Sequence, residues 1–123
     1  MNNLEVIYSY TRKQAIEDGV LIDVSDTATE VGIKYPVAVT SAVWNRYIKP
    51  DSSLKSFGQS VHGRLWDMLW MFCVNTFICK DSILYYDVYF LMEKKLELIT
   101  LKAVCGPGDT MSPVVTIMLS GED

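Results

Sequence analysis

The residues from Ser60 to Ile78 form the longest strongly apolar stretch of the chain, and their spacing constrains the fold more than any other feature. A first set of side chains recurs at helical intervals and comprises Leu65, Met68, Leu69, Phe72 and Thr76. A second set lies beside it and comprises Trp66, Trp70, Cys73 and Phe77. An amphipathic helix needs only one apolar face, so two neighbouring sets predict a central helix that is buried on two sides.

Few polar side chains interrupt this stretch. Arg64 and Asp67 lie three residues apart, which predicts an ion pair on the helix surface. Only about eleven residues follow Asp67, whereas a membrane span needs about twenty apolar residues, so we expect no membrane segment here. The three tryptophans, Trp44, Trp66 and Trp70, are expected to lie in the core.

Short elements are expected before the central helix. In chain order they are a strand or extended segment over 4–10, a helix over 12–18, a strand over 20–24, a helix over 25–31, an extended segment or helical lead over 36–39, a helix over 40–48 and a polar loop over 51–58. Thr11 and Gln14 form a capping-box pattern at the start of the first helix. Gly19 and Gly32 are expected to end the first and second helices.

After residue 82 the apolar period changes from 3.6 to 2, which indicates strands. The expected strands cover residues 83–92, 96–105 and 114–119, with a turn at 93–95. Short connections favour an antiparallel meander with one apolar face and one mixed face. We expect a helix or a partner subunit to cover part of the mixed face. The predicted fold class is α+β: N-terminal helices and the long central helix packed on a C-terminal three-stranded meander, which N-terminal strands can extend.

Length and composition limit the possible functions. With 123 residues the chain fits a single domain over 1–123, and 50% of the residues are hydrophobic. This apolar content exceeds what one small core readily hides, which predicts a homo-oligomer. The formal net charge of −4 argues against direct nucleic-acid binding, because such binding depends on clustered lysine and arginine.

The beginning of the chain and its cysteines suggest a compartment. Residues 1–5 have neither the basic nor the apolar region of an export signal, so we expect a cytoplasmic protein. Three cysteines cannot all pair, and Cys73 and Cys105 sit in apolar patterns, which indicates reduced, buried thiols. The chain has a single histidine and no CxxC pattern, so no metal site is predicted.

The loop from Cys105 to Asp109 is the strongest candidate for a site. Its two glycines flank Pro107 and can expose successive N–H groups to an anion. The alternative is a plain hairpin connection in which the glycines supply positive φ and Asp109 forms a local turn. The loop lacks the lysine of a phosphate-binding loop and the spacing of a dinucleotide fingerprint, so no cofactor is predicted.

Two further groups could carry chemistry. His62 could activate Cys105 as a nucleophile, although a cysteine at the end of an apolar strand is more often inert. Tyr8, Tyr10 and Arg12 could stack a base and hold a phosphate or carboxylate, or they could form a strand edge before a capped helix. The candidate ligand-binding residues are Tyr10, Arg12, His62, Arg64, Cys105, Gly106, Gly108 and Asp109.

Four motifs carry a resemblance that extends over almost the whole chain. They are YSYTR at 8–12, PVAVT at 36–40, GRLWD at 63–67 and LKAVCGPGD at 101–109. With these motifs the chain resembles an uncharacterised family of small proteins carried by plasmids, prophages and other mobile elements. The resemblance lends no catalytic residues. It implies an accessory protein that binds host machinery or modulates host defence.

These observations lead to one hypothesis and one alternative. The hypothesis is a non-enzymatic cytosolic protein of a mobile element that acts as an oligomer on a host protein or a small anionic ligand such as a nucleotide. The alternative is a small enzyme that uses the Cys105–Asp109 loop together with Arg12 or His62.

Overall fold

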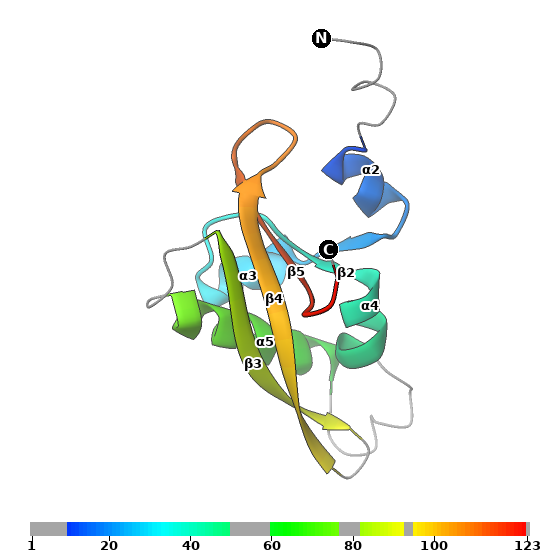
Figure 1. Ribbon diagram of the computed structural model, residues 1–123, viewed down its shortest axis with the longest axis vertical. Coiled ribbons are helices and arrows are strands. Elements are labelled where there is room, and N and C mark those ends of the chain that lie inside the picture. Colours follow the sequence, from blue (N-terminus) through cyan, green and yellow to red (C-terminus); the bar gives the residue numbers. More distant parts are fainter. Residues whose placement is uncertain (1–9, 50–59, 77–81, 93–94, 123) are drawn as a thin grey trace.

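The computed structural model describes residues 10–49, 60–76, 82–92 and 95–122, which form an α+β fold as predicted (Figure 1). Its helices are α2 (Arg12–Glu17), α3 (Ser25–Val31), α4 (Ser41–Val43), the π-helical turn η1 (Trp44–Ile48) and α5 (Val61–Thr76). Its strands are β1 (Leu21–Asp23), β2 (Val37–Thr40), β3 (Ile83–Met92), β4 (Lys95–Pro107) and β5 (Pro113–Leu119). In Figure 1, α3 and α5 lie behind β3 and β4.

One mixed sheet contains all five strands, in the order β1-β2-β5-β4-β3. The antiparallel meander of β3, β4 and β5 is confirmed. The N-terminal strands extend it, because β2 pairs with β5 in parallel and β1 pairs with β2 antiparallel. The parallel pair is sterically possible because the connection from β2 to β5 is far longer than the dozen or so residues that a parallel crossover needs.

Local sequence signals explain the boundaries of α2 and α3. Thr11 Oγ1 accepts a hydrogen bond from the N–H of Gln14 at 3.0 Å, and Gln14 Oε1 accepts one from the N–H of Thr11 at 3.0 Å, which confirms the capping box. Gly19 follows α2 with φ of +77°, and Gly32 ends α3 with φ of +111°. Side chains other than glycine rarely adopt these values, so the two glycines stop the helices where predicted.

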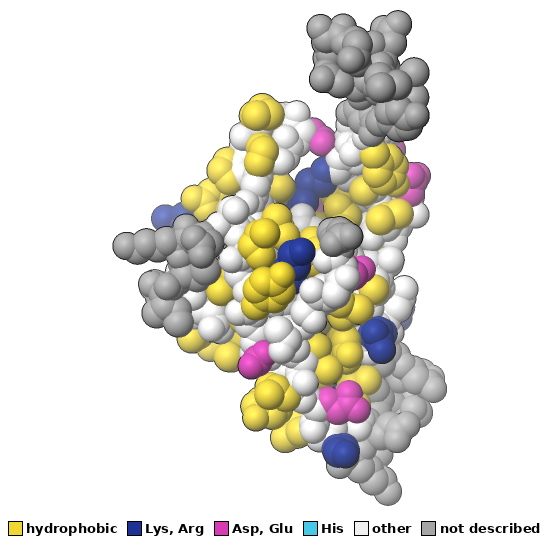
Figure 2. All heavy atoms as spheres, in the orientation of Figure 1, with side chains coloured by type: hydrophobic (Ala, Val, Ile, Leu, Met, Phe, Trp, Pro, Cys, Tyr) yellow, Lys and Arg dark blue, Asp and Glu magenta, His cyan; other side chains and the backbone are white. Residues whose placement is uncertain are grey.

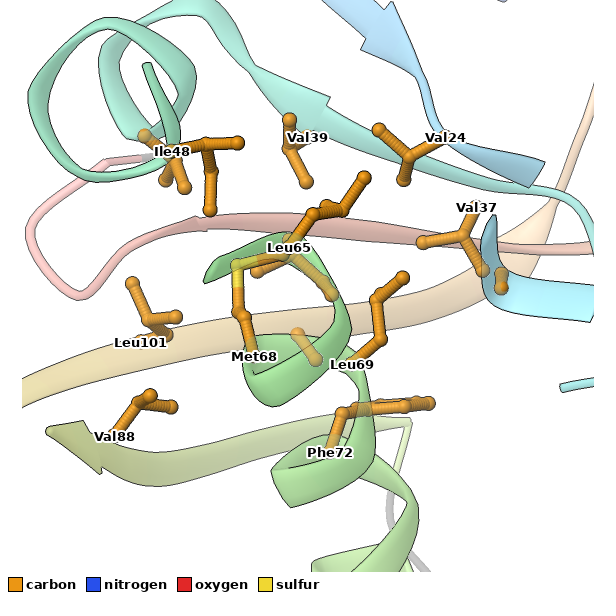
Figure 3. Packing of buried hydrophobic residues seen from close by; sticks show 14 of the residues in the cluster. Val24, Val37, Val39, Ile48, Leu65, Met68, Leu69, Phe72, Val88 and Leu101 are labelled. Atoms are coloured by element: carbon orange, nitrogen blue, oxygen red, sulfur yellow. The ribbon is translucent and has the colours of Figure 1, made fainter. Parts of the chain in front are cut away.

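The core lies between α5 and the face of the sheet that packs on it (Figure 3). From α5 it receives four of the side chains of the first predicted set, namely Leu65, Met68, Leu69 and Phe72. Tyr86, Val88 and Phe90 of β3 point to the same side and are buried, as the alternation along the strand predicts. We call the face of the sheet turned away from α5 the outer face.

Two predictions about the central helix are wrong. It is buried on one side only: the Trp70 side chain is 48% exposed and stacks on the half-buried Trp66 at a ring distance of 5.8 Å. Arg64, expected at the surface in an ion pair with Asp67, is only 4% exposed. The reason is geometric, because the sheet lies against one side of the helix and Arg64 belongs to that side.

The helix predicted over 40–48 changes its form after one turn. Thr40 caps its start, since its Oγ1 accepts a hydrogen bond from the N–H of Val43 at 3.3 Å. The following turn is wider, and the N–H of Lys49 donates to the carbonyl of Trp44 at 2.7 Å, five residues back. This wider turn places Tyr47 in the core, where its ring stacks on Phe90 at 5.2 Å.

Some predictions fall on residues that the structure does not describe. These are most of the strand predicted over 4–10, the loop at 51–58, Cys79 and part of the turn at 93–95. The helices of residues 10–49 and 60–76 include none that is both long and apolar enough to cross a bilayer.

Candidate functional site

The loop between β4 and β5 reaches the first turn of α2. The two carboxylate oxygens of Asp109 accept hydrogen bonds from the backbone N–H groups of Arg12 at 2.9 Å and Lys13 at 3.0 Å. These N–H groups have no partner within the helix, and the positive end of the helix favours a negative charge. Asp109 therefore caps α2 from a distance of 97 residues along the chain.

The Arg12 side chain extends from α2 to β5. Its Nη1 donates to Oγ1 of Thr116 at 2.6 Å, and its Nη2 donates to the carbonyl of Val115 at 2.8 Å. Burial lowers the pKa of Arg12, while the nearby charges of Asp23 and Asp109 act in the opposite direction. The guanidinium stays charged at any physiological pH and holds α2 against the sheet.

A pocket of about 330 Å³ lies beside this contact. Its lining is formed by α2, β1, the start of α3, the segment before β2, the loop between β4 and β5 and the start of β5, namely Arg12, Lys13, Ile16, Glu17, Asp23, Ser25, Pro36, Asp109 and Val114. Three of these side chains are acidic and two are basic. The pocket therefore offers no net attraction to an anion.

The glycines of the loop do not have the predicted conformation. The glycines with positive φ in the described ranges are Gly19 and Gly32, and in this loop the positive φ, +69°, belongs to Met111. The N–H of Gly108 donates to the carbonyl of Ser112 at 2.8 Å, so this N–H is already used in a hydrogen bond within the loop. Gly108 is required for space, because a Cβ there would lie 2.8 Å from Cγ1 of Val114.

Alanine substitutions should separate the two glycines. Gly108→Ala is expected to lower the free energy of unfolding by about 1–3 kcal/mol, because the new methyl group clashes with Val114. Gly106→Ala should have a much smaller effect, because a Cβ at Gly106 meets nothing within 4 Å. Urea unfolding followed by circular dichroism measures both. Equal losses in the two variants would contradict this assignment.

The other predicted site residues lie apart from one another. Cys105 pairs with Val115 and packs against the core, whereas Arg12 contacts Thr116, whose side chain points to the outer face. His62 is exposed at the start of α5, with its Nε2 3.8 Å from a carboxylate oxygen of Glu30 on α3. The contacts found in the described residues thus do not join His62 to Cys105.

Tyr10 and the free thiols complete the set of candidate groups. The Tyr10 hydroxyl donates to a carboxylate oxygen of Asp18 at 2.6 Å, and this hydrogen bond raises the pKa of Tyr10. Cys73 and Cys105 are free and only half-buried, and burial raises the pKa of the Cys73 thiol. Nowhere in the described ranges do three His, Cys, Asp or Glu side chains gather closely enough to hold a metal ion.

The Arg64 guanidinium donates hydrogen bonds to neighbouring elements of the fold. Its Nε donates to the carbonyl of Tyr47, its Nη1 to the carbonyl of Leu91 at 2.9 Å, and its Nη2 to Sδ of Met92 at 3.2 Å. The guanidinium carbon lies 5.1 Å from the centre of the Phe90 ring. Burial lowers the pKa of this group. Arg64 therefore connects α5 to η1 and to the end of β3.

The carboxylate of Asp109 gives the fold a specific dependence on pH. Hydrogen bonds from the N–H groups of Lys13 and Arg12 hold its pKa below the ordinary value. Because the folded-state pKa is the lower one, the contribution of Asp109 to stability is complete above its unfolded-state pKa of about 4 and is lost as the pH falls through the folded-state pKa.

We therefore expect Asp109→Ala to melt at a lower temperature than the parent protein at pH 7. The difference should shrink as the pH is lowered below about 4, since the protonated carboxyl caps α2 less well. Thermal unfolding at a series of pH values measures it. A difference that is independent of pH would contradict the proposed role of the carboxylate.

The outer face of β3 and β4 holds a surface that the sequence predictions missed. Five large apolar side chains there are between 42% and 65% exposed, namely Ile83, Tyr85, Tyr89, Leu96 and Leu98. We call them the outer patch. Figure 2 shows hydrophobic side chains spread over this face with few charges among them. The signal was present in the alternation of β3, which puts Tyr85 and Tyr89 on the mixed face.

A groove runs along the edge of the sheet beside this patch. It has a volume of about 460 Å³ and lies between α5 and the strands β3 and β4. Its lining comprises Asp67, Trp70, Met71, Asp87, Val88, Tyr89 and Leu98. We call it the edge groove. Asp87 accepts a hydrogen bond from Thr100 at 2.6 Å, and in the described ranges neither of the two groove carboxylates is ion-paired.

The fold and these surfaces define a small α+β protein whose mixed sheet is covered by the long helix on one face and keeps an apolar outer face. The chain belongs to a family of unknown function, DUF6573, whose family model matches residues 1–123. No curated protein and no solved structure matches the chain.

Proposed function

We propose that the protein is a non-enzymatic binding protein that docks a protein partner on the outer patch. The observation that carries the proposal is the group of five large apolar side chains exposed together on one sheet face. Contiguous apolar surface of a few hundred Å² is typical of interaction sites, and removing it from water on binding favours the complex. The tyrosines of the patch and Trp70 belong to the residue types that dominate binding energy at protein interfaces.

The same geometry favours a protein partner over a small anionic ligand. The pocket beside Arg12 has mixed charges, and the Arg12 guanidinium already bonds to β5. The edge groove carries two carboxylates, and the chain has a net charge of −4, which repels phosphate groups. A partner from the host cell would suit the accessory role in a mobile element that the sequence resemblance implies.

The enzymatic alternative has less support. The sheet separates Cys105, which packs on the core side, from the Arg12 guanidinium on the outer side. His62 lies at the start of α5 beside Glu30. Neither Cys105 nor His62 is placed to act together with Asp109. The two carboxylate oxygens of Asp109 already accept hydrogen bonds from α2.

A matched pair of tyrosine variants tests the proposal. Tyr89→Ser removes the most exposed aromatic ring of the outer patch, and Tyr35→Ser removes a ring of similar exposure outside it. Each tagged variant is incubated with lysate of the natural host, and captured proteins are quantified by mass spectrometry. We expect the partner captured by the parent protein to fall at least about tenfold with Tyr89→Ser and to be unchanged with Tyr35→Ser. Equal capture by all three proteins would overturn the proposal.

The predicted homo-oligomer needs a separate measurement. Light scattering of the purified protein gives its mass in solution. Comparison with Tyr89→Ser then shows whether any self-association uses the outer patch.

A further inference from the structure

The edge of the sheet indicates how the partner binds. Resting on the proposed function, we propose that the partner contributes an extended peptide that pairs with β3 along Tyr85 to Tyr89, at the edge where no other described strand pairs, and that carries lysine or arginine side chains facing Asp67 and Asp87. Such strand addition draws its affinity from backbone hydrogen bonds and its specificity from alternate side chains.

The backbone of β3 is arranged to accept another strand. The N–H of Cys105 donates to the carbonyl of Ser82 at 2.7 Å, directly across from it in the register of β3 and β4. Residues that exchange bonds alternate with residues that do not, so even-numbered residues of β3 bond to β4. Between Tyr85 and Tyr89 the odd-numbered residues turn their N–H and C=O groups to the edge of β3 at which no other described strand pairs, and these residues are Tyr85, Asp87 and Tyr89. The contact from Arg64 to the carbonyl of Leu91, another odd-numbered residue, agrees with this alternation.

Within the described residues, the strand at this edge lacks the sequence features that usually protect against pairing. Natural edge strands are commonly short, bulged, or supplied with lysine or proline. β3 is ten residues long, contains neither lysine nor proline, and pairs with β4 in an unbroken register. β1 at the opposite edge is only three residues long. The edge groove lies along Asp87, Val88 and Tyr89, beside the outward-turned backbone groups.

The carboxylates near the edge of β3 favour a peptide with basic side chains. Side chains of an added strand alternate between the two faces of the sheet. Those on the outer face would lie near Asp87 and Tyr89, and those on the other face near Asp67 and Trp70. A basic side chain on either face would meet a carboxylate that is not ion-paired within the described residues. The aromatic rings beside the carboxylates add apolar surface and attract cations.

A second copy of this chain fits the edge less well. Two-fold antiparallel pairing of β3 centred on Asp87 would place two carboxylates directly opposite each other, which is destabilising. Other registers still bring Asp67 and Asp87 of both copies to one edge. The charges therefore favour a basic peptide from another protein.

Synthetic peptides test the proposal with the intact protein. The probe is an eight-residue peptide in which two valines alternate with two lysines, so that lysine side chains point to both faces of the added strand. One control has glutamate in place of lysine, and a second is methylated on the backbone nitrogens that would face β3. By calorimetry we expect the lysine peptide to bind, and both controls to bind at least about tenfold more weakly. Equal binding of the methylated peptide would overturn the strand pairing.

Matched charge variants test the acidic residues. Asp87→Lys should weaken binding of the lysine peptide at least about tenfold, while Glu17→Lys on α2, with the same change in net charge, should leave it within about twofold. Circular dichroism checks that both variants fold. Equal weakening by the two variants would show that only net charge matters and would overturn the proposed contact.

Amide hydrogen exchange supplies a readout specific to the edge. On addition of the lysine peptide, the amides of Tyr85, Asp87 and Tyr89 should become protected, whereas their even-numbered neighbours already bond to β4. Protection of these three amides without peptide, together with a dimeric mass, would instead assign the edge to a second copy. If the Tyr89→Ser variant loses its lysate partner but these amides never respond to peptide, the docking function stands and strand addition fails.

Discussion

Replacement of Arg64 by methionine is expected to lower the free energy of unfolding by about 3–5 kcal/mol. Methionine fills much of the space of the arginine stem but donates no hydrogen bonds. The buried carbonyl of Tyr47 and the part-buried carbonyl of Leu91 would lose their Arg64 donor, and the Arg64 side chain itself is only 4% exposed. Each buried acceptor left without a donor costs about 1–3 kcal/mol.

Lysine at the same position provides the control. Arg64→Lys keeps the positive charge, but one ammonium group cannot reproduce the planar arrangement that contacts η1 and β3 together. We expect Arg64→Lys to lower the free energy of unfolding relative to the parent protein, but by less than Arg64→Met does. Urea unfolding followed by tryptophan fluorescence measures all three proteins. A loss below about 1 kcal/mol for Arg64→Met would show that these contacts contribute little.

The second large effect is expected on the buried side of α5. Phe72→Ala should cost about 3–5 kcal/mol, because the ring is buried and packs on Tyr86 at a ring distance of 6.0 Å. Trp70→Ala should cost less than about 1 kcal/mol despite the larger side chain, because Trp70 is half exposed.

Thermal and urea unfolding compare the stabilities of these two variants, whose substituted residues lie two positions apart on the same helix. It distinguishes a helix that is buried on one side from one that is buried on two. Similar losses in both variants would restore the two-sided burial that the sequence pattern predicts. A large loss of partner capture with Trp70→Ala, at nearly unchanged stability, would extend the binding surface into the edge groove.

Sequence periodicity predicted the helices and strands better than it predicted which of their faces are buried. The spacing of Leu65, Met68 and Phe72 correctly identified one face of α5, and alternation correctly put Tyr86 and Val88 on the core side of β3. Periodicity states which side chains share a face, but not whether another element covers that face. The second apolar set of α5 was therefore predicted to be buried, and Arg64 was predicted to be exposed.

The candidate site shows the same limit. Arg12 and Asp109 were both singled out from local motifs, yet their contact joins residues 97 apart in the chain, which no local spacing reveals. Turn composition suggested that Gly108 is needed for its φ angle, whereas the structure shows that the proximity of Val114 requires it. The parallel pairing of β2 with β5 depends on the whole sheet and could not be derived from either strand alone.

The position of β5 in the sheet has a consequence for how the chain folds. β5 is the last strand in sequence, but it lies between β2 and β4 and pairs with both. The segment that ends with β2 and the hairpin of β3 and β4 share no strand pairing until β5 inserts between them. Contacts that close such long loops slow folding. During synthesis on the ribosome, we expect β2 and β4 to expose unpaired edges until β5 has left the exit tunnel, so that sheet assembly follows translation of nearly all the described residues.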